Sequence, residues 1–537
     1  MRLRSFAIRN HARLQDAGIE VREHLVLVGP NDVGKSSVLR CLDLLLGATT
    51  AQLYGRLTTA DLRNPDEPLV VSAMFADLDD DDRAWFPDEI SIDPATGAAS
   101  LEVRLEVRLE DSEALDLLRF LPGGGGRRQV SRDQLARLGW RLVGAVSSVR
   151  DLRDDRNATL DDILRSIDLG AERAELTTIT EQFQDKLTGS SKLGGLRGML
   201  ATQLSRALPE TVEQDDLSFV PGATATDDVF SDVRLQVWRH GTIRNLSEQS
   251  DGTRAMFAVA LYDLVSGSAN IVAIDEPELH LHPSSQHSIA SLLRAGSNQK
   301  ILATHSSDIV GTFPPESVVT VKAGGVLVQP QPDFLTGEDK ILIHWWIRDR
   351  LEPLTARRIV AVEGASDRVI LEKAAEVTGR DLDRLGVSII EGDGSNNVKP
   401  IAKLFGPAGF DVPLSILIDL DAVASTAAGL GVAPDDLSSH SVWISDKDLE
   451  AEYVSALGAA DVWDALRRST LFPPNELKNC PVTGPGAVPA DADLAEFCGH
   501  KRRKVRAALA VAAALTEHTA RQIKSVEGLL ADLEANL

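Results

Sequence analysis

The pattern of apolar positions along the chain predicts several short buried strands. Nearly continuous apolar runs occur at 24–28, 271–274, 301–303, 358–362 and 414–418. Such runs, bounded by polar or turn residues, are typical of strands in a protein interior. Each of these runs is followed by polar residues of a kind that binding or catalysis uses. We therefore expect an α/β fold with functional residues where strands end.

Other stretches indicate how the chain is divided. Alternation of apolar and polar residues at 69–75 and 101–109 predicts antiparallel strands with one face in water. From 151 the sequence becomes polar and favours helix, which indicates a helical subdomain inserted into the first α/β unit. The expected division is 1–150 and 233–340 for the two parts of the first unit, 151–232 for the insertion, 341–356 for a linker helix and 357–537 for a second α/β unit.

Charge narrows the classes of function. The formal net charge of the 537 residues is −24, which argues against a general nucleic-acid binder, because such proteins carry a basic face. A metal-dependent nuclease stays open, since carboxylates around metal ions are offset once the ions bind.

The sequence also bears on location. No window approaches the ~20 apolar residues of a membrane span, and the N-terminal segment lacks the apolar stretch of a secretory signal. Cys41, Cys480 and Cys498 are scattered, so that they suggest neither a disulfide framework nor a zinc site. We expect a cytoplasmic protein with reduced thiols and no membrane partner.

The residues after the first predicted strand have the spacing of a phosphate-binding loop, G-x-x-x-x-G-K-[ST]. Glycines let backbone N–H groups face the phosphates, and the helix that follows adds its positive N-terminal end. Lys35 is expected to reach the β- and γ-phosphates and Ser36 to bind Mg²⁺. The residues predicted to bind ATP in this loop are Gly29, Pro30, Asn31, Asp32, Val33, Gly34, Lys35, Ser36 and Ser37.

Two later strands end in residues that suit ATP hydrolysis. Asp275 is expected to bind the Mg²⁺ ion, and Glu276 to polarise the attacking water as a catalytic residue. His305 follows the next apolar strand, in the position of a γ-phosphate sensor. The alternatives are a solvated acidic turn and a structural histidine.

A fourth motif, NLSEQSDGTR at 245–254, directly precedes a predicted helix. It resembles the signature motif of the ABC ATPases. The resemblance implies that two chains sandwich ATP, with Ser250 and Gly252 of one chain facing the γ-phosphate held by Lys35 of the other. A homodimer is therefore expected, and a higher oligomer stays open.

Acidic residues form a second group after position 357. Glu363 and a glycine follow one buried strand, and Asp419 and Asp421 follow another as D-x-D. Because strand residues two apart point to the same face, both aspartates can project toward Glu363. Hard oxygen ligands of this kind suit Mg²⁺ or Mn²⁺. Acids at strand ends are also common without a metal.

The order of the motifs resembles the OLD ("overcoming lysogenisation defect") family, in which an ABC-type ATPase head precedes a Toprim domain. The run DEPELHLHP at 275–283 is typical of that group, and the acidic pair of Glu363 and Asp367 resembles the pair in OLD nucleases. The implied fold is an ABC-type head with an inserted helical dimerisation subdomain, followed by a C-terminal Toprim α/β domain.

The resemblance also implies roles for individual residues. Glu363 would be a catalytic base or metal ligand, and Asp367, Asp419 and Asp421 would bind metal. Glu450 would complete a second metal position, with Asp448 and Glu452 as alternatives. Lys504 would stabilise the transition state, with Lys501 as the alternative. The basic cluster at 500–506 opens a helix, where cations are disfavoured, which suggests a partner anion such as a nucleic-acid phosphate.

The function predicted from both groups is an ATP-binding, Mg²⁺- or Mn²⁺-dependent endonuclease that cuts DNA under the control of ATP. The family also suggests a role in defence against phage. Two alternatives stay open: an ATP-driven sensor or scaffold whose Toprim domain is inactive, and an effector that cleaves RNA. A primase or topoisomerase is less favoured, because no motif places a nucleophilic tyrosine and no zinc module is visible.

Overall fold

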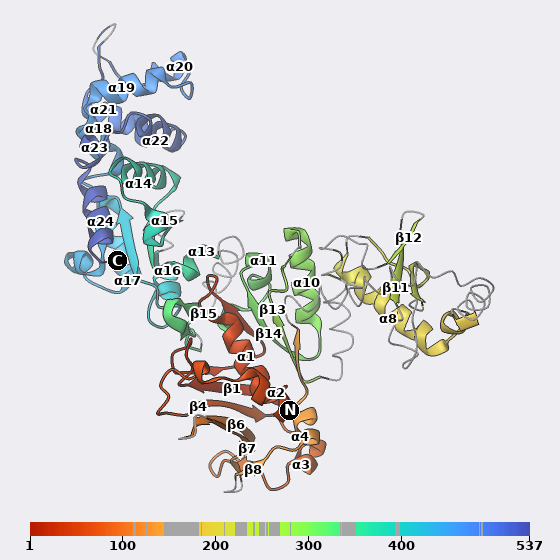
Figure 1. Ribbon diagram of the computed structural model, residues 1–537. Coiled ribbons are helices and arrows are strands. Elements are labelled where there is room, and N and C mark those ends of the chain that lie inside the picture. Colours follow the sequence, from red (N-terminus) through yellow and green to blue (C-terminus); the bar gives the residue numbers. More distant parts are fainter. Residues whose placement is uncertain are drawn as a thin grey trace. The chain divides into compact units, whose positions relative to one another are not determined.

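The computed structural model in Figure 1 describes two compact units, one within Met1–Gln329 and the other beginning at Pro330. No helix among the residues that the structure describes is long and apolar enough to cross a membrane. The residues described are 1–110, 114–123, 127–143, 182–183, 185–208, 210–220, 234–239, 242–245, 253, 256, 269–279, 281–332, 334–335, 351–392, 398–482, 484 and 487–536.

The first unit contains a six-stranded sheet in the order β16-β15-β3-β14-β13-β9, parallel except for β16. Three of the predicted strands are neighbours in it, and their apolar residues are almost fully buried. Because they are parallel, their carboxyl ends meet at one edge. The bounds are β3 Leu25–Val28, β9 Trp140–Val143, β13 Ile271–Asp275, β14 Gln299–Thr304, β15 Val318–Lys322 and β16 Val326–Val328.

A second sheet of this unit is antiparallel, in the order β2-β1-β4-β6-β7-β8, with β5 paired to β6. Buried and partly exposed residues alternate strictly along β4, as its sequence predicts. One core joins the buried faces of the two sheets and α1 (Lys35–Leu46). The strands are β1 Arg2–Arg9, β2 Ala17–Glu20, β4 Leu69–Ala76, β5 Ile90–Ile92, β6 Ala99–Leu109, β7 Leu115–Leu121 and β8 Arg128–Gln129.

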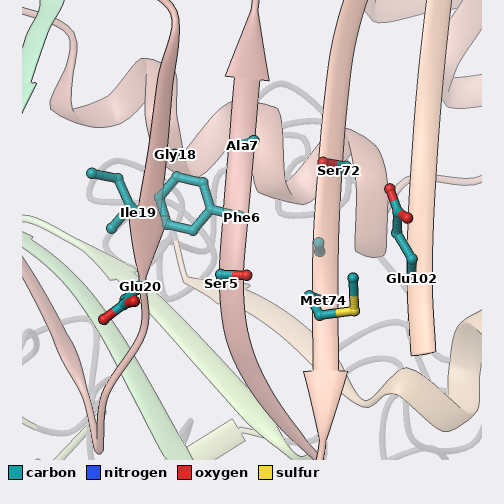
Figure 2. A pocket seen from close by; sticks show the side chains of 10 residues that line it. Ser5, Phe6, Ala7, Gly18, Ile19, Glu20, Ser72, Met74 and Glu102 are labelled. Atoms are coloured by element: carbon teal, nitrogen blue, oxygen red, sulfur yellow. The ribbon is translucent and has the colours of Figure 1, made fainter. Parts of the chain in front are cut away.

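Figure 2 shows a shallow cavity of about 180 Å³ over β2, β1, β4 and β6. Its lining is mostly apolar, with Phe6, Ile19 and Met74, and it includes two carboxylates, Glu20 and Glu102. None of its lining residues belongs to the motifs predicted to bind ATP or metal.

The remaining described elements of this unit include a helix and a small sheet from the central stretch of the chain. The helix α8 (Ser191–Ala207) fits the helical character predicted there. A strand, β10 (Leu217–Val220), also lies in that stretch and pairs antiparallel with β11 (Arg234–Arg239). The other elements are β12 Thr242–Asn245, α2 Thr50–Arg56, α3 Asp80–Trp85, α4 Arg132–Leu138, α10 Pro283–Ala295 and α11 Ser307–Val310.

The second unit is built on a four-stranded parallel sheet in the order β18-β17-β19-β20, followed by a helical C-terminal region. Its strands are β17 Arg358–Val362, β18 Val387–Glu391, β19 Leu414–Ile418 and β20 Val442–Ile444. Its helices are α13 Glu352–Thr355, α14 Ala365–Val377, α15 Leu382–Leu385, α16 Val398–Phe405, α17 Val423–Leu430, α18 Leu449–Leu457, α19 Ala459–Arg468, α20 Pro474–Leu477, α21 Asp491–Gly499, α22 Lys504–Ala512, α23 Glu517–Ala520 and α24 Lys524–Ala535.

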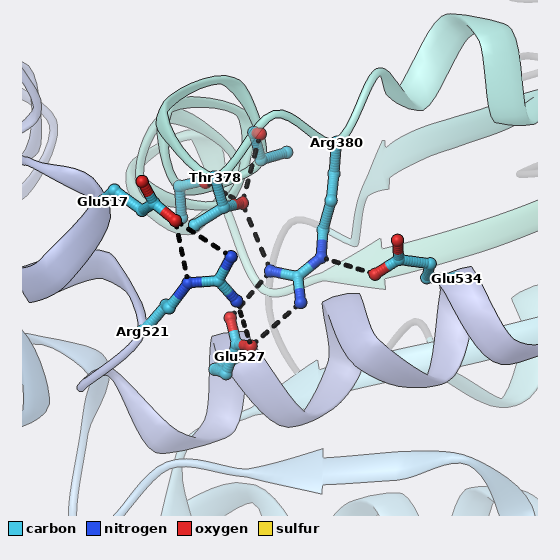
Figure 3. Close-up of polar contacts among 8 residues, drawn as sticks. Thr378, Arg380, Glu517, Arg521, Glu527 and Glu534 are labelled. Carbon is cyan, nitrogen blue, oxygen red and sulfur yellow. Dashed lines mark hydrogen bonds and ion pairs between the residues drawn. The ribbon is translucent and has the colours of Figure 1, made fainter.

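A network of ion pairs fixes the last helices to α14 (Figure 3). Arg380, just beyond α14, lies 2.7 Å from Glu527 and 3.2 Å from Glu534. Arg521 lies 3.2 Å from Glu527 and 3.1 Å from Glu517. The C-terminal helices are thereby joined to the helix that follows β17.

Candidate functional site

Two glycines set the shape of the loop between β3 and α1. A Cβ atom on Gly29 would lie 2.3 Å from the backbone oxygen of Val321, so only glycine fits there. Gly34 has a φ of 116°, a conformation that favours glycine, and it directly precedes the first residue of α1. The loop therefore has the tight turn before a helix that a phosphate-binding loop needs.

Lys35 points back into this loop. Its Nζ donates hydrogen bonds to the backbone oxygens of Gly29 (2.8 Å) and Pro30 (2.7 Å) and lies 3.3 Å from Nδ1 of His305. Lys35 is 5% exposed, and burial lowers the pKa of its ammonium, while the charge of Glu276 raises it. The cation is therefore held where loop carbonyls surround it.

Ser36 and Asp275 meet at the end of β13. Burial raises the pKa of the Asp275 carboxyl, and the nearby Ser36 hydroxyl opposes that rise. Oδ1 of Asp275 is buried and makes no hydrogen bond to the described residues. A hydroxyl beside a carboxylate with a spare oxygen is a donor set that fits Mg²⁺.

Glu276 and His305 are brought together because β13 and β14 are neighbours. Oε1 of Glu276 lies 3.0 Å from Nε2 of His305, whose Nδ1 lies 3.2 Å from the backbone oxygen of Gly29. Glu276 has a φ of 51°, which is uncommon for a residue with a side chain. His305 thus links the phosphate loop to the carboxylate predicted to act on water.

The sequence analysis assigned no role to Glu278. Its Oε1 accepts a hydrogen bond of 2.5 Å from the backbone N–H of His305, and burial raises the pKa of its carboxyl. In the sequence, Glu278 stands out only as the second glutamate of DEPE, and this motif does not indicate its hydrogen-bond partner. Ser250 and Gly252 lie outside the described residues, so that their predicted place at a dimer interface stays a prediction.

In the second unit, Glu363, Asp419 and Asp421 each offer an oxygen, and these atoms lie within 4.8 Å of one another. Glu363 follows β17, Asp419 follows the neighbouring β19, and Oε1 of Glu363 accepts the backbone N–H of Asp419 at 2.9 Å. Burial raises the pKa values of the Glu363 and Asp419 carboxyls. Three carboxylates at this spacing fit one divalent cation.

The sequence predicted that Asp419 and Asp421 point the same way as alternate residues of one strand, and this prediction was wrong. β19 ends at Ile418, and a short 3₁₀ turn, Leu420–Ala422, begins after Asp419. The two aspartates are therefore not alternate residues of one strand. The turn, and not the strand period, places Asp421 near Glu363.

The other predicted acids differ in how their oxygens are used. Asp367 accepts the backbone N–H of Gly364 and the hydroxyl of Ser366, each at 3.0 Å, and is 3% exposed. Asp448 caps α18 by accepting the backbone N–H of Ala451 at 2.7 Å. Asp448 thus has a structural contact at the start of the helix.

Glu452 and Glu450 are the remaining candidates for the second metal position. Glu452 accepts hydrogen bonds from other parts of the unit, whereas Glu450 lies beside Lys504. Glu452 accepts the backbone N–H of Asp446 at 2.8 Å and the hydroxyl of Ser525 at 2.7 Å. Glu450 is 2% exposed, its Oε2 lies 3.6 Å from Nζ of Lys504, and burial raises its pKa to about 7.

Lys504 lies among three of these carboxylates. Its Nζ is 3.4 Å from Asp419, 3.6 Å from Glu450 and 3.7 Å from Asp367. Burial alone would lower the pKa of Lys504, but the three carboxylates raise it overall. Lys501 is exposed to solvent.

Part of the basic cluster at 500–506 is compensated by acids of the protein itself. Besides Lys504, Arg506 lies 2.7 Å from Glu476, and Arg503 lies over the ring of Phe497. Internal acids thus face Lys504 and Arg506, while contact of the exposed Lys501 with a nucleic-acid phosphate stays a prediction.

Three family models match the chain. They are "AAA ATPase domain" over residues 1–93, "AAA domain, putative AbiEii toxin, Type IV TA system" over 61–311, and "Overcoming lysogenization defect protein-like, TOPRIM domain" over 354–421. Together they confirm the fold class predicted from the sequence, an ATPase head followed by a Toprim region.

Individual proteins are similar over most of the chain. The Old nuclease of Escherichia phage P2 is 20% identical over 469 residues, which cover 78% of this chain and 77% of that protein. The OLD nuclease of Thermus scotoductus is 23% identical over 458 residues, 78% of this chain and 82% of that protein. Among solved structures, the C-terminal region of the Burkholderia pseudomallei OLD protein matches 34% of this chain and 98% of its own length, with 23% identity and a TM-score of 0.28.

Proposed function

Because this chain belongs to the OLD family, with an ATPase domain followed by a Toprim domain, we propose that it is an ATP-binding endonuclease that depends on Mg²⁺ or Mn²⁺ and cuts DNA. The observation that carries the proposal is the convergence of Glu363, Asp419 and Asp421 within 4.8 Å at the ends of neighbouring strands. The relatives named as nucleases support it.

In this proposal Glu363, Asp419 and Asp421 hold a divalent ion. When bound, such an ion supplies a polarised phosphate oxygen and a more acidic water. The alternative role for Glu363 is that of a general base, which takes a proton from the attacking water. Lys504 brings a positive charge for the phosphate in the transition state.

The head would hold ATP through the loop N–H groups and Lys35, which would exchange its bonds to Gly29 and Pro30 for phosphate oxygens. Ser36 and Asp275 would hold the Mg²⁺ ion of the nucleotide. Glu276 would orient the attacking water, with His305 fixing its carboxylate at 3.0 Å.

We propose further that hydrolysis needs a second chain, whose Ser250 and Gly252 complete the site. The ATPase rate per chain should then rise with protein concentration and level off as dimers form. A rate per chain that is constant from nanomolar to micromolar protein would argue for a complete site in each monomer.

A plasmid assay tests the nuclease. Supercoiled DNA is incubated in Mg²⁺ or Mn²⁺ with the wild-type protein, Asp419→Ala, and the control Asp435→Ala, which alters an exposed aspartate of the same unit. We expect metal-dependent nicking by the wild type and the control, and a loss of about 100-fold or more in Asp419→Ala.

Parallel reactions with tRNA and total RNA identify the substrate. If the protein cuts RNA and not DNA, the proposed DNA endonuclease is wrong and the chain is an RNA-cleaving effector. The absence of any metal-dependent cutting would leave the ATP-driven sensor or scaffold.

A further inference from the structure

We propose that the ammonium of Lys504 occupies the second cation position of the Toprim site. The site would then take one divalent ion at Glu363, Asp419 and Asp421, and a second ion only when Lys504 moves out. This inference rests on the proposed function in one respect, that the carboxylates bind divalent metal.

The carboxylates form two groups with different spacings: the proposed metal ligands, and the carboxylates around Lys504. Oxygens of the first group lie within 4.8 Å of one another, which allows one ion to contact all three. Among the described residues, Asp367, Asp419 and Glu450 do not form such a group. They surround Nζ of Lys504 at 3.4–3.7 Å, whereas Mg²⁺ needs oxygens at about 2.0–2.1 Å. The ammonium of Lys504 therefore lies in the space between the oxygens of the second group.

Burial explains why this position needs a cation. Asp367 is 3% exposed and Glu450 is 2% exposed, and buried carboxylates are costly unless a positive charge faces them. Oε1 of Glu450 is also buried and has no hydrogen-bond partner among the described residues. One oxygen at this position thus stays available to a ligand other than Lys504.

An ammonium and a divalent ion cannot share the space between the same carboxylates, because their charges repel at a few ångströms. Binding of one therefore displaces the other. Lys504 is suited to leave, since it is the first residue of α22 and its charge sits on a flexible four-carbon stem.

Two of the three carboxylates are held independently of Lys504. Asp367 is fixed by Gly364 and Ser366, and Oδ1 of Asp419 accepts the backbone N–H of Leu449 at 3.0 Å. Removal of the ammonium should thus open the position to a metal ion while Asp367 and Asp419 stay in place. A displaced Lys504 would then be free to meet a substrate phosphate.

Calorimetric titration of the full chain with Mn²⁺ tests the inference. All proteins carry Asp275→Asn, which removes the ion ligand of the head. The variants are Lys504→Met, which keeps most of the length of the side chain without its charge, Lys504→Arg, and Lys501→Met as the matched control at an exposed lysine. Asp419→Asn identifies the ions bound in the Toprim unit.

We expect one tightly bound ion in the wild type, Lys504→Arg and Lys501→Met. In Lys504→Met we expect a second ion, bound about tenfold or more tightly than any second ion of the wild type. If Lys504→Met melts below the assay temperature, Lys504→Gln takes its place, and the rise in Tm with Mn²⁺ gives the same comparison.

Equal numbers and affinities of ions in the wild type and the neutral variants would overturn the role of Lys504 and leave the metal site standing. No binding of Mn²⁺ to any of the proteins would overturn both this inference and the proposed nuclease.

Discussion

The carboxylate of Glu278 accepts the backbone N–H of His305 at 2.5 Å, although the two residues lie 27 positions apart. The contact forms because β13 and β14 are neighbours in a parallel sheet. It holds His305 at the point where its ring joins Glu276 to the phosphate loop. We therefore predict that Glu278 positions His305 for ATP hydrolysis.

We expect Glu278→Ala to lower the kcat for ATP by roughly tenfold, because a buried hydrogen bond costs about 1–3 kcal/mol to lose and 1.4 kcal/mol is tenfold in rate. Affinity for ATP should change little, since Glu278 does not belong to the phosphate loop. Steady-state kinetics and binding of a fluorescent ATP analogue measure the two effects.

Glu278→Gln is the conservative variant for this prediction. It keeps an acceptor oxygen for the His305 N–H and should recover most of the rate. A purely structural role would instead lower the melting temperature without separating kcat from affinity.

The close approach of Gly29 to Val321 predicts that Gly29→Ala abolishes ATP binding. The added Cβ would lie 2.3 Å from a backbone oxygen, so the loop must shift away from its present path. Gly55→Ala is the matched control, because its Cβ meets nothing within 4 Å. Retained ATP affinity in Gly29→Ala would show that the loop does not bind phosphate in this conformation.

The network in Figure 3 predicts how the stability of the second unit depends on pH. The hydrogen bond from Arg380 is the main cause that holds the pKa of Glu527 below its ordinary value. A carboxyl with a lowered folded pKa contributes stability above its unfolded pKa, about 4.5, and loses it as the pH falls through the folded pKa.

Glu527→Gln should therefore cost about 1–2 kcal/mol at pH 7, and the difference should disappear near pH 3. Glu517→Gln is the control: its partner Arg521 and its own side chain are largely exposed, at 46% and 64%, so its ion pair contributes little. Calorimetric unfolding of the full chain from pH 7 to 3 compares them. A constant deficit of Glu527→Gln over that range would contradict the ion-pair explanation.

The sequence was sufficient to predict the functional residues at strand ends, because apolar runs and short motifs are local features of the chain. Lys35, Asp275, Glu276 and His305 follow apolar runs, and parallel neighbours bring such ends together. Glu363 and Asp419 meet for the same reason.

The remaining features depend on tertiary contacts that no local pattern carries. Asp421 reaches the site through a 3₁₀ turn, which two residues of D-x-D do not specify. The bond of Glu278 to His305 requires knowledge of which strands are adjacent. The basic cluster at 500–506 suggested an external anion, because its acidic partners, such as Glu476 and Asp367, are distant in sequence.

In the proposed function, ATP in the head controls a nuclease in the Toprim unit. The most direct test is the rate of plasmid nicking in Mg²⁺, with and without ATP, for the wild type and Lys35→Ala. We predict that ATP changes the wild-type rate and leaves the rate of Lys35→Ala unchanged. The same response to ATP in both proteins would contradict the claim.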